Sequence, residues 1–302
     1  MRNAIIDVGS NSVILTIEDW DGSRWRPYLE LTEVTALGEN VKLTGRLSPE
    51  AIERTSAALK RFTERARAEG SPVRAFATMS ARLASNTWKL VERASQFGLK
   101  LDVLSADDEA RYGFLAVVTD PKFSCLDRIS IVDPGGQSTE LVTATRNGSG
   151  WNTDFRRSYA VGTLGLKESL FPDERLTPSQ LLSSIPAIDD LIGLCYLPRE
   201  AGAAVVLGAS GTNLISIRDR LATWQPDLVH GARLDYEEVS KAVSWLGRMS
   251  DQERAAVVGM ERGREKTIHL GALILERFLF ALRVVEAFVS IRGWRHGILE
   301  QE

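Results

Sequence analysis

The sequence contains little of what several protein classes need. Its 302 residues include two cysteines, Cys125 and Cys195, and three histidines that lie far apart in the chain. Two cysteines cannot build a disulfide scaffold or a four-cysteine metal site, and scattered histidines argue against a zinc enzyme. No apolar run reaches the roughly 18 residues of a membrane-spanning helix. An acid and a glycine interrupt the amino terminus before a signal-peptide core can form. We therefore expect a soluble, cytoplasmic protein with no membrane partner.

An excess of basic residues is also missing. Thirty-seven lysines and arginines stand against 40 acidic residues, which gives a formal net charge of −3. A dedicated nucleic-acid-binding protein normally has a basic excess or stripe, so no nucleic-acid partner is expected. The composition is otherwise typical of a globular protein, with 44% hydrophobic and 25% charged residues. Because a chain of this length exceeds what one hydrophobic core usually serves, two domains are expected.

Short apolar runs alternate with helical patterns, and this predicts an α/β fold. Residues 4–7 and 13–17 are predicted to pair as a hairpin across a Gly/Ser/Asn turn, followed by a strand at 25–34. The first clear helix is predicted from Ser48, an N-cap followed by Pro49, to about residue 68. Further strands are predicted at 73–77, 101–104, 128–133, 140–145, 203–207 and 284–290. Further helices are predicted at 85–96, 107–117, 236–249 and 271–282, after Thr177-Pro178 and after Gly293.

One pattern occurs twice along the chain. A strand that ends in aspartate, a glycine-serine loop and a second strand occupy residues 4–17, and the same order returns at residues 128–145. Between the two copies, the composition shift at residues 120–122 predicts a linker. The economical explanation is two domains built on one plan. We assign them to residues 1–118 and 119–302, with the last helix able to pack back on the first domain.

Three predicted loops share one design, in which glycine is mixed with serine or threonine after an apolar strand. Glycine permits close approach of the backbone, so that successive N–H groups can point at one anion. A single loop of this kind is more often an ordinary turn. Three of them, two directly after an aspartate, favour a phosphate-binding site. The predicted phosphate-binding residues are Gly9, Ser10, Asn11, Ser12, Gly135, Gly136, Gln137, Ser138, Gly208, Ser210, Gly211 and Thr212.

Each of four charged residues near these loops has a structural and a functional interpretation. Asp7 and Asp133 end their strands, where a carboxylate either forms a turn or, as one of a matched pair, holds Mg²⁺ against phosphate. Glu109 ends an acidic triplet that local sequence explains by the helix dipole, whereas a functional role would be that of a general base. Arg82 follows a strand and can contact phosphate or form a surface ion pair.

Taken together, these residues resemble the exopolyphosphatase and guanosine pentaphosphate phosphatase (Ppx/GppA) family, in its short two-domain form. Several motifs carry the resemblance in the right order along nearly the whole chain. They are Ile6-Asp7-Val8-Gly9-Ser10-Asn11-Ser12, Ala77-Thr78 with Arg82 and Asn86, Leu104-Ser105 with Glu109-Ala110-Arg111, Val132-Asp133 with Gly135-Gly136 and Ser138-Thr139-Glu140, residues 208–212 and residues 271–275. The resemblance implies two actin-like (ribonuclease H-like) domains with a cleft between them, as in the actin, sugar-kinase and acetate-kinase superfamily.

The resemblance also implies a reaction. It implies Mg²⁺-dependent removal of the terminal phosphate from inorganic polyphosphate or from guanosine pentaphosphate. Glu109 matches the water-activating glutamate of the family, and Arg82 matches a phosphate-binding arginine. Asp133 matches the metal-associated aspartate and Glu140 an acidic partner, which together with Asp7 gives the expected metal-binding set. A homodimer is the family's usual state.

Some positions depart from the family pattern, and they motivate other hypotheses. Pro134 precedes the second loop, Gln137 replaces the third of three consecutive glycines, and Ile14 stands where a basic residue is frequent. Residues 290–297 lack two acids of the family pattern. The alternative to a phosphohydrolase is therefore a non-catalytic sensor of polyphosphate or of guanosine tetra- and pentaphosphate that uses the same cleft. A third reading is a small-molecule kinase, although no adenosine-binding signature stands out.

Overall fold

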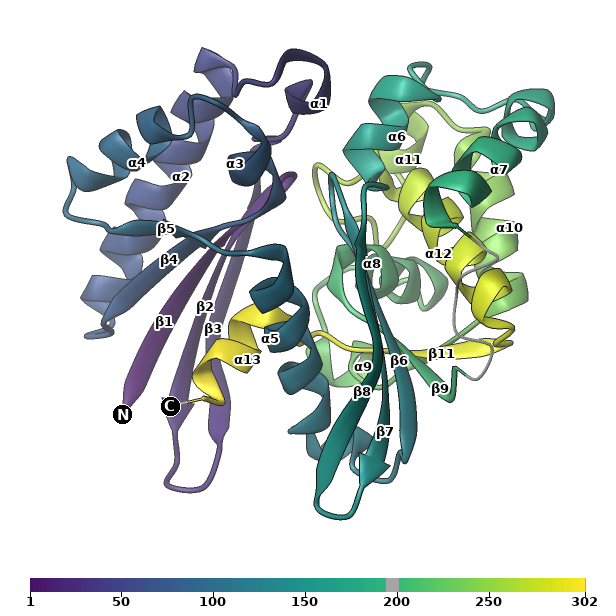
Figure 1. Cartoon of the computed structure of the whole chain (residues 1–302). Coiled ribbons are helices and arrows are strands. Elements are labelled where there is room, and N and C mark those ends of the chain that lie inside the picture. Colours follow the sequence, from purple (N-terminus) through teal and green to yellow (C-terminus); the bar gives the residue numbers. More distant parts are fainter. Residues whose placement is uncertain (194–200, 302) are drawn as a thin grey trace. The chain divides into compact units, whose positions relative to one another are not determined.

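The computed structural model describes residues 1–193 and 201–301, so Cys195 lies outside the described residues. The chain forms two compact units. Unit 1 comprises Met1–Leu115 and the segment that begins at Trp294, and unit 2 comprises Ala116–Gly293. Each unit contains a mixed sheet with helices (Figure 1). The predicted α/β class is therefore confirmed.

The sheet of unit 1 begins with the predicted hairpin. Its strands are β1 (Arg2–Val8), β2 (Ser12–Trp20), β3 (Trp25–Val34), β4 (Val73–Ala77) and β5 (Leu101–Val103). They follow the order β3-β2-β1-β4-β5. β1, β2 and β3 are antiparallel, whereas β4 pairs in parallel with both β1 and β5. Because Asp7 lies opposite Ile14 across the hairpin, β1 delivers Asp7 to the end of the sheet from which the first glycine-serine loop projects.

Several helices of unit 1 begin where the sequence predicts, but those at Val41–Thr44 and Met79–Leu83 were not predicted. The helices of this unit are α1 (Val41–Thr44), α2 (Pro49–Ala68), α3 (Met79–Leu83), α4 (Trp88–Ser95), α5 (Ala106–Val118), which continues into unit 2, and α13 (Trp294–Leu299). The hydroxyl of Ser48 accepts a hydrogen bond from the N–H of Ala51, which confirms the predicted cap of α2. The helix predicted from residue 85 starts later, at Trp88. The Asn86 side chain instead bonds both the N–H and the C=O of Leu47, at 2.8 and 2.9 Å, and holds this segment in a turn.

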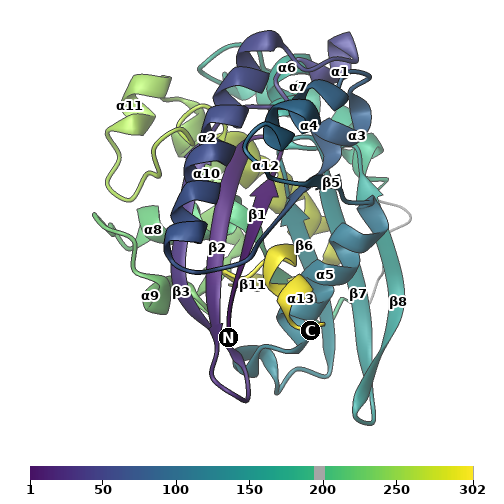
Figure 2. The same ribbon diagram turned by 90° about the vertical axis from the view of Figure 1, so that its left-hand side faces the viewer.

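Helix α13 packs on the sheet of unit 1, although about 180 residues separate it from the rest of that unit (Figures 1 and 2). The indole N–H of Trp25 donates to the carbonyl of Leu299 at 2.8 Å. Arg295 donates to the Thr16 hydroxyl and to the Glu30 carboxylate, each at 2.6 Å. Trp294, Ile298 and Leu299 complete a buried apolar cluster with Ile5, Trp25 and Leu104.

The sheet of unit 2 repeats the plan of unit 1. Its strands are β6 (Arg128–Pro134), β7 (Thr139–Asn147), β8 (Gly150–Tyr159), β9 (Ala203–Val206), β10 (Arg233–Asp235) and β11 (Glu286–Val289). They follow the order β10-β11-β9-β6-β7-β8. Strands β6, β7 and β8 are antiparallel and β9 is parallel to β6, as for β1–β3 and β4.

Matching hydrogen bonds in the two units confirm the predicted internal repeat. In unit 1, the N–H of Gly9 donates to the carbonyl of Ser12 at 2.9 Å. In unit 2, the N–H of Gly135 donates to the carbonyl of Ser138 at 2.8 Å. Asp133 lies opposite Glu140 in the second hairpin, as Asp7 lies opposite Ile14 in the first. The two loops therefore have equivalent places in the two sheets.

The helices of unit 2 include elements that the sequence reading missed. They are the 3-10 turn η1 (Pro121–Phe123) and α6 (Thr163–Ser169), α7 (Pro178–Ile192), α8 (Gly208–Arg218), α9 (Pro226–Val229), α10 (Tyr236–Gly247), α11 (Asp251–Ala255) and α12 (Ile268–Leu282). Neither α6 nor strand β8 was predicted. A capping box of Thr177 and Gln180 begins α7, which confirms the predicted cap. Among the residues that the structure describes, no helix is both long and apolar enough to cross a membrane.

Residues 120–122 are folded against unit 2, and the prediction of a linker there is wrong. Asp120 is buried, accepts a hydrogen bond from the N–H of Lys122 and begins η1. Its carboxylate lies 3.0 Å from Nε2 of His230 and 3.7 Å from the Arg292 guanidinium. Burial on its own would raise the pKa of Asp120, but His230, the Lys122 N–H and Arg292 outweigh it and lower that pKa. The proline that suggested a break instead starts this turn.

His269, at the start of α12, is a buried imidazole in the core of unit 2. Within the part of the chain that the structure describes, neither ring nitrogen has a hydrogen-bond partner. Burial, helped by the charges of Arg254 and Lys167, lowers the pKa of His269 from 6.5 to about 3. Arg254 is itself wholly buried and donates to the carbonyls of Leu246, Met249 and Glu174. The folded protein therefore keeps His269 neutral.

We expect His269 to weaken the protein in acid. Below pH 6.5 the unfolded chain binds a proton at His269 that the folded protein does not, so the free energy of unfolding falls as the pH falls, until about pH 3. At about 1.4 kcal/mol per pH unit, this residue costs about 2 kcal/mol at pH 5. Urea unfolding at pH 7.5 and pH 5 should show that His269→Leu removes about that much of the pH dependence. An equal loss of stability between pH 7.5 and pH 5 in the wild type and in His269→Leu would show that His269 does not cause the pH dependence.

Candidate active site

The loop after β1 is held by backbone hydrogen bonds, both within the loop and from residues 35–38. A Cβ atom on Gly9 would lie 3.1 Å from the carbonyl oxygen of Ser12, so a side chain there would press on the turn. The carbonyl of Ser10 accepts from Gly38 N–H at 2.7 Å, and that of Asn11 accepts from Thr35 and Ala36. Ser10, Asn11 and Ser12 are buried, as is Asp7 at the end of β1. Unit 1 thus presents Asp7 and the predicted phosphate-binding residues 9–12 on one rigid turn.

Arg82 and Glu109 form an ion pair in unit 1. Arg82 lies in the last turn of α3 and Glu109 in the first turn of α5. One terminal guanidinium nitrogen of Arg82 donates to Glu109 Oε2 at 2.9 Å and to the carbonyl of Leu104 at 2.6 Å. The two side chains are only 19% and 11% exposed. Arg82 is therefore engaged with another functional candidate, rather than in the surface ion pair that its local sequence allowed.

The three acids at the start of α5 have different surroundings. Asp108 accepts a hydrogen bond from the Ser105 hydroxyl at 2.7 Å and pairs with Arg111 at 3.1 Å, both within its own segment. Both contacts agree with the helix-dipole reading of the acidic triplet. Glu109 pairs with a residue 27 positions away on another helix. This long-range contact is one that the local sequence does not reveal.

The loop after β6 depends on a glycine that the sequence reading did not select. A Cβ atom on Gly162 would lie 2.5–2.6 Å from the backbone N, Cα and C of Gln137. The N–H of Thr163 donates to Gly135 O at 3.0 Å, and that of Leu164 donates to Gly136 O at 2.7 Å. The start of α6 is therefore packed directly on the loop. Nothing in the local pattern around Gly162 signals this contact, because it joins segments 25 residues apart.

Gln137 does not project from the loop. Its side chain is fully buried, and its amide nitrogen lies 3.5 Å from Glu168 Oε2 on α6. Pro134, the other departure in this loop, is the last residue of β6 and lies opposite Thr139. The second loop keeps the hydrogen bond from Gly135 to Ser138 despite both substitutions. The two departures therefore leave the loop's turn geometry intact.

Asp133 and Glu140 lie side by side in unit 2. They are directly opposed on antiparallel strands, so their side chains extend from the same face of the sheet. Glu140 is buried and accepts a hydrogen bond from the Ser158 hydroxyl at 2.7 Å. Asp133 lies against the start of α8, where a Cβ atom on Gly208 would be 2.9 Å from Asp133 Oδ1. Unit 2 thus brings together the Asp133–Glu140 pair, the second loop and the first turn of α8.

Residues 208–212 are helical, and the prediction of a third loop there is wrong. Gly208 has φ of +75° and begins α8 directly after β9. Gly211 is required by packing, since a Cβ atom there would lie 2.8 Å from Val206 Cγ1. Ser210 lies against Gly271 of α12, and the Thr212 hydroxyl is 3.5 Å from the carbonyl of Ala209. A glycine-rich helix start supplies unpaired backbone N–H groups in place of a loop.

The carboxylates have the donor chemistry that Mg²⁺ requires. Across residues 1–193 and 201–301, no three His, Cys, Asp or Glu side chains gather closely enough to form a metal site by themselves. Mg²⁺ is usually bound through one or two carboxylates, with water and substrate phosphates completing its coordination. The Asp133–Glu140 pair therefore fits Mg²⁺ in the presence of a phosphate substrate.

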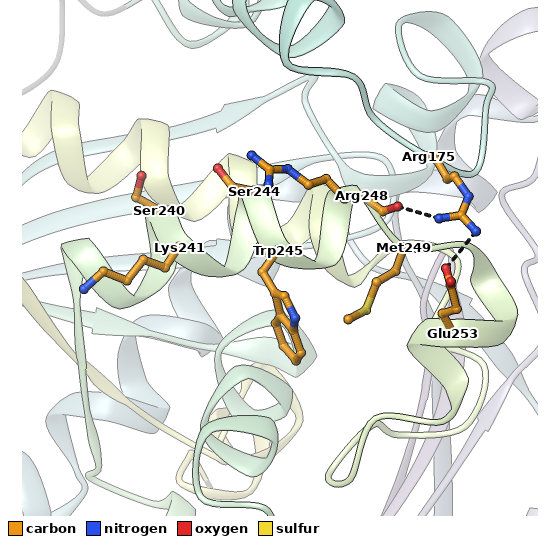
Figure 3. Close-up of a pocket in the computed structure, with 8 residues that line it drawn as sticks. All are labelled: Arg175, Ser240, Lys241, Ser244, Trp245, Arg248, Met249 and Glu253. Carbon is orange, nitrogen blue, oxygen red and sulfur yellow. Dashed lines mark hydrogen bonds and ion pairs between the residues drawn. The ribbon is translucent and has the colours of Figure 1, made fainter.

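A hollow of about 530 Å³ lies elsewhere in unit 2, along α10 (Figure 3). Arg175 closes one end of it, paired with Glu253 at 2.9 Å and bonded to the carbonyl of Arg248 at 2.8 Å. Trp245 and Lys241 of α10 are among the residues that line it. It contains none of the residues that the sequence singled out. The candidate site is therefore defined by the loops and charged pairs above, and not by the hollow on α10.

Comparison with known proteins decides the family. Residues 17–302 match the Ppx/GppA phosphatase family. The chain belongs to that family. The resemblance drawn from the sequence is thus confirmed, and with it the actin-like fold of the Ppx/GppA proteins.

Three relatives show how far the likeness extends. Exopolyphosphatase 2 of Mycobacterium tuberculosis (strain H37Rv) is 27% identical over 99% of this chain and 96% of its own length. A bifunctional 3-dehydroquinate synthase/phosphatase of Fusobacterium nucleatum is 25% identical over 91% of this chain, but this chain spans only 43% of that protein. The crystal structure of the Aquifex aeolicus Ppx/GppA family member is 30% identical, with a TM-score of 0.81 over 100% of this chain and 97% of that one.

Proposed function

We propose that this protein is a phosphohydrolase that releases terminal orthophosphate from inorganic polyphosphate. The observation that carries the proposal is the duplicated turn, in which an aspartate and a glycine-serine loop with the same hydrogen bond occur in both units. Such turns present backbone N–H groups to phosphate oxygens. The relative named exopolyphosphatase 2, which aligns over nearly its whole length, supports polyphosphate as the substrate class. Guanosine pentaphosphate, which also ends in a phosphoanhydride, is the second candidate substrate.

The proposed roles follow from the chemistry of each side chain. Glu109 is the general base that takes a proton from the attacking water. Arg82 contacts the terminal phosphoryl group, where its guanidinium offsets negative charge. The loop residues 9–12 and 135–138, with the first turn of α8, bind phosphate oxygens through N–H groups and hydroxyls. Phosphoryl transfer depends mainly on positioning and charge neutralisation, which these groups are suited to supply.

Mg²⁺ is the proposed metal. Asp133 and Glu140 of unit 2 would hold it. Asp7, at the equivalent strand end of unit 1, is a further proposed metal-binding carboxylate. When bound, Mg²⁺ would neutralise phosphate charge and polarise a phosphoryl oxygen. The protein's own part is to orient these carboxylates, for which the hydrogen bond from Ser158 to Glu140 is one means.

Gln137 bears on the alternative of a non-catalytic sensor. That alternative was motivated by a side chain at the third position of the second loop. Because the side chain is buried beside Glu168 and the turn is retained, it gives no steric reason for the loss of phosphate binding or turnover. Hydrolysis is therefore the function that the site supports best.

Phosphate release tests the proposal directly. Long-chain polyphosphate and guanosine pentaphosphate should each be incubated with the protein, with Mg²⁺ and with the metal chelated. We expect orthophosphate to appear from polyphosphate with Mg²⁺ and to fall at least 100-fold after chelation, because the carboxylates alone leave phosphate charge unneutralised. Binding of either compound by folded protein without phosphate release would favour the sensor instead.

A further inference from the structure

The hollow along α10 is lined mainly by two rows of side chains from that helix and its C-terminal end (Figure 3). Ser240, Ser244 and Arg248 follow one another at intervals of four residues, which places them in line along the helix surface. Lys241 and Trp245 belong to a second row with the same spacing, beside the first. The volume of about 530 Å³ lies within the range of small-molecule sites, about 300–1,000 Å³. The hollow is therefore large enough to hold a small ligand.

Positive charge dominates the hollow, although one acid lines it. Glu253 is paired with Arg175 at 2.9 Å, so these two charges offset each other. Lys241 lies 3.5 Å from Glu237, one turn back on α10, and both side chains are largely exposed. An exposed pair of this kind contributes little free energy, so another anion can replace it. Lys241 and Arg248 are therefore the charges that the hollow offers to a ligand.

Several hydrogen-bond donors of the hollow have no acceptor in the protein. Across residues 1–193 and 201–301, neither the guanidinium of Arg248 nor the indole N–H of Trp245 makes a hydrogen bond. The same is true of the Ser240 and Ser244 hydroxyls in the described part of the chain. An unpaired guanidinium in line with two hydroxyls is suited to the oxygens of a phosphate group.

Trp245 indicates that the ligand also has a flat ring. Its side chain is 46% exposed, although tryptophan is a residue that proteins usually bury. Stacking of a nucleic-acid base on an aromatic side chain typically increases affinity about 5- to 150-fold. A simple anion would leave the Trp245 ring in water, and an apolar compound would leave Arg248 without a partner. A nucleotide, which joins a base to phosphates, satisfies both.

We propose that the hollow along α10 binds a nucleotide, with its base stacked on Trp245 and its phosphates held by Arg248, Lys241 and the two serine hydroxyls. Arg175 has a positioning role, because it holds the carbonyl of Arg248 at 2.8 Å and closes one end of the hollow. None of the residues proposed for hydrolysis lines the hollow. The inference therefore stands apart from the proposed phosphohydrolase.

The experiment measures the Kd of GDP by calorimetry, with divalent metal chelated so that no phosphate is released. We expect Trp245→Leu to weaken binding at least tenfold, because the base loses its stacking partner. Trp245→Phe, which keeps an aromatic ring, should stay within about threefold of the wild type. Arg248→Gln should weaken binding at least fivefold, since it removes a charge-assisted hydrogen bond and leaves the carbonyl bonded to Arg175 in place.

Trp224→Leu is the matched control. Trp224 is also in unit 2 and is 50% exposed, but it does not line the hollow. Its substitution should change the Kd of GDP less than about twofold. Thermal unfolding of every variant verifies that it is folded.

Inorganic pyrophosphate distinguishes a nucleotide site from a simple anion site. Binding of pyrophosphate as tight as that of GDP, with neither affected by Trp245→Leu, would overturn the proposal in favour of a simple anion. Absence of GDP binding, or binding that both Trp245→Leu and Arg248→Gln leave unchanged, would also overturn it. Phosphate release from polyphosphate should be the same in Trp245→Leu and in the wild type. A protein that binds GDP as expected but releases no phosphate would support the nucleotide site and contradict the proposed hydrolase.

Discussion

Glu109→Gln is expected to lower kcat for phosphate release from polyphosphate at least 100-fold, while the protein stays folded. Glutamine keeps the size of the side chain and can still accept a hydrogen bond from Arg82, but its amide cannot take a proton from water. General bases typically contribute 10²–10⁴-fold to rate. Steady-state release of orthophosphate under saturating Mg²⁺ gives kcat.

The matched control for this variant is Asp108→Asn. It removes one carboxylate from the same turn of α5, which bonds Ser105 and Arg111 of its own segment. We expect its kcat to stay within a factor of three of the wild type. If Glu109→Gln keeps more than a tenth of the wild-type kcat, another residue is the base. A similar loss in both variants would instead point to a general effect of charge at the start of α5.

Gly162→Ala is expected to damage the second glycine-serine loop. The new methyl group would overlap the backbone of Gln137 at 2.5–2.6 Å, and a backbone, unlike a flexible side chain, cannot turn away. Overpacking of this kind costs about 1–3 kcal/mol. Movement of α6 would also break the bonds from Thr163 and Leu164 to the loop carbonyls. We expect the free energy of unfolding to fall by that amount and phosphate release to fall at least tenfold.

Gly150→Ala provides the comparison. Gly150 begins the strand that precedes Gly162, its φ is not positive, and a Cβ atom there would lie 3.8 Å from the nearest atom, an ordinary contact. Denaturant unfolding should show a change below about 0.5 kcal/mol for this variant. If the two substitutions prove equally mild, the approach of Gly162 to the loop does not constrain the site.

Much of the fold was readable from the sequence because local chemistry and burial agree there. The first two strands carry continuous apolar residues, and α2 has Ser48 and Pro49 at its start, so propensity, capping and packing all give the same element. The twofold repeat was readable for the same reason, since aspartate and glycine recur at equivalent strand ends.

The misread elements are those whose structure is determined by distant residues. From the local sequence, Gly208 and Gly211 predict a loop. In the structure, a Cβ atom at position 208 would lie too close to Asp133, and one at position 211 would lie too close to Val206. The edge strand β8 is largely exposed, so it carries no apolar alternation to reveal it. The same limit applies to the candidate site. Residue types suggested a base among three acids, and the contact of Glu109 with Arg82 on another helix could not be read from the local sequence.

The position of α13 has a consequence for how the chain folds as it is made. Unit 1 is interrupted, because all of unit 2 is synthesised between α5 and the residues that cover Trp25, Ile5 and Leu104. The sheet of unit 1 therefore leaves the ribosome with part of its apolar surface uncovered and keeps it so until α13 emerges. Domains usually fold in the order of synthesis. Here unit 1 is completed only after unit 2 has been made, and a ribosome stalled within unit 2 would hold a nascent chain with this apolar surface exposed.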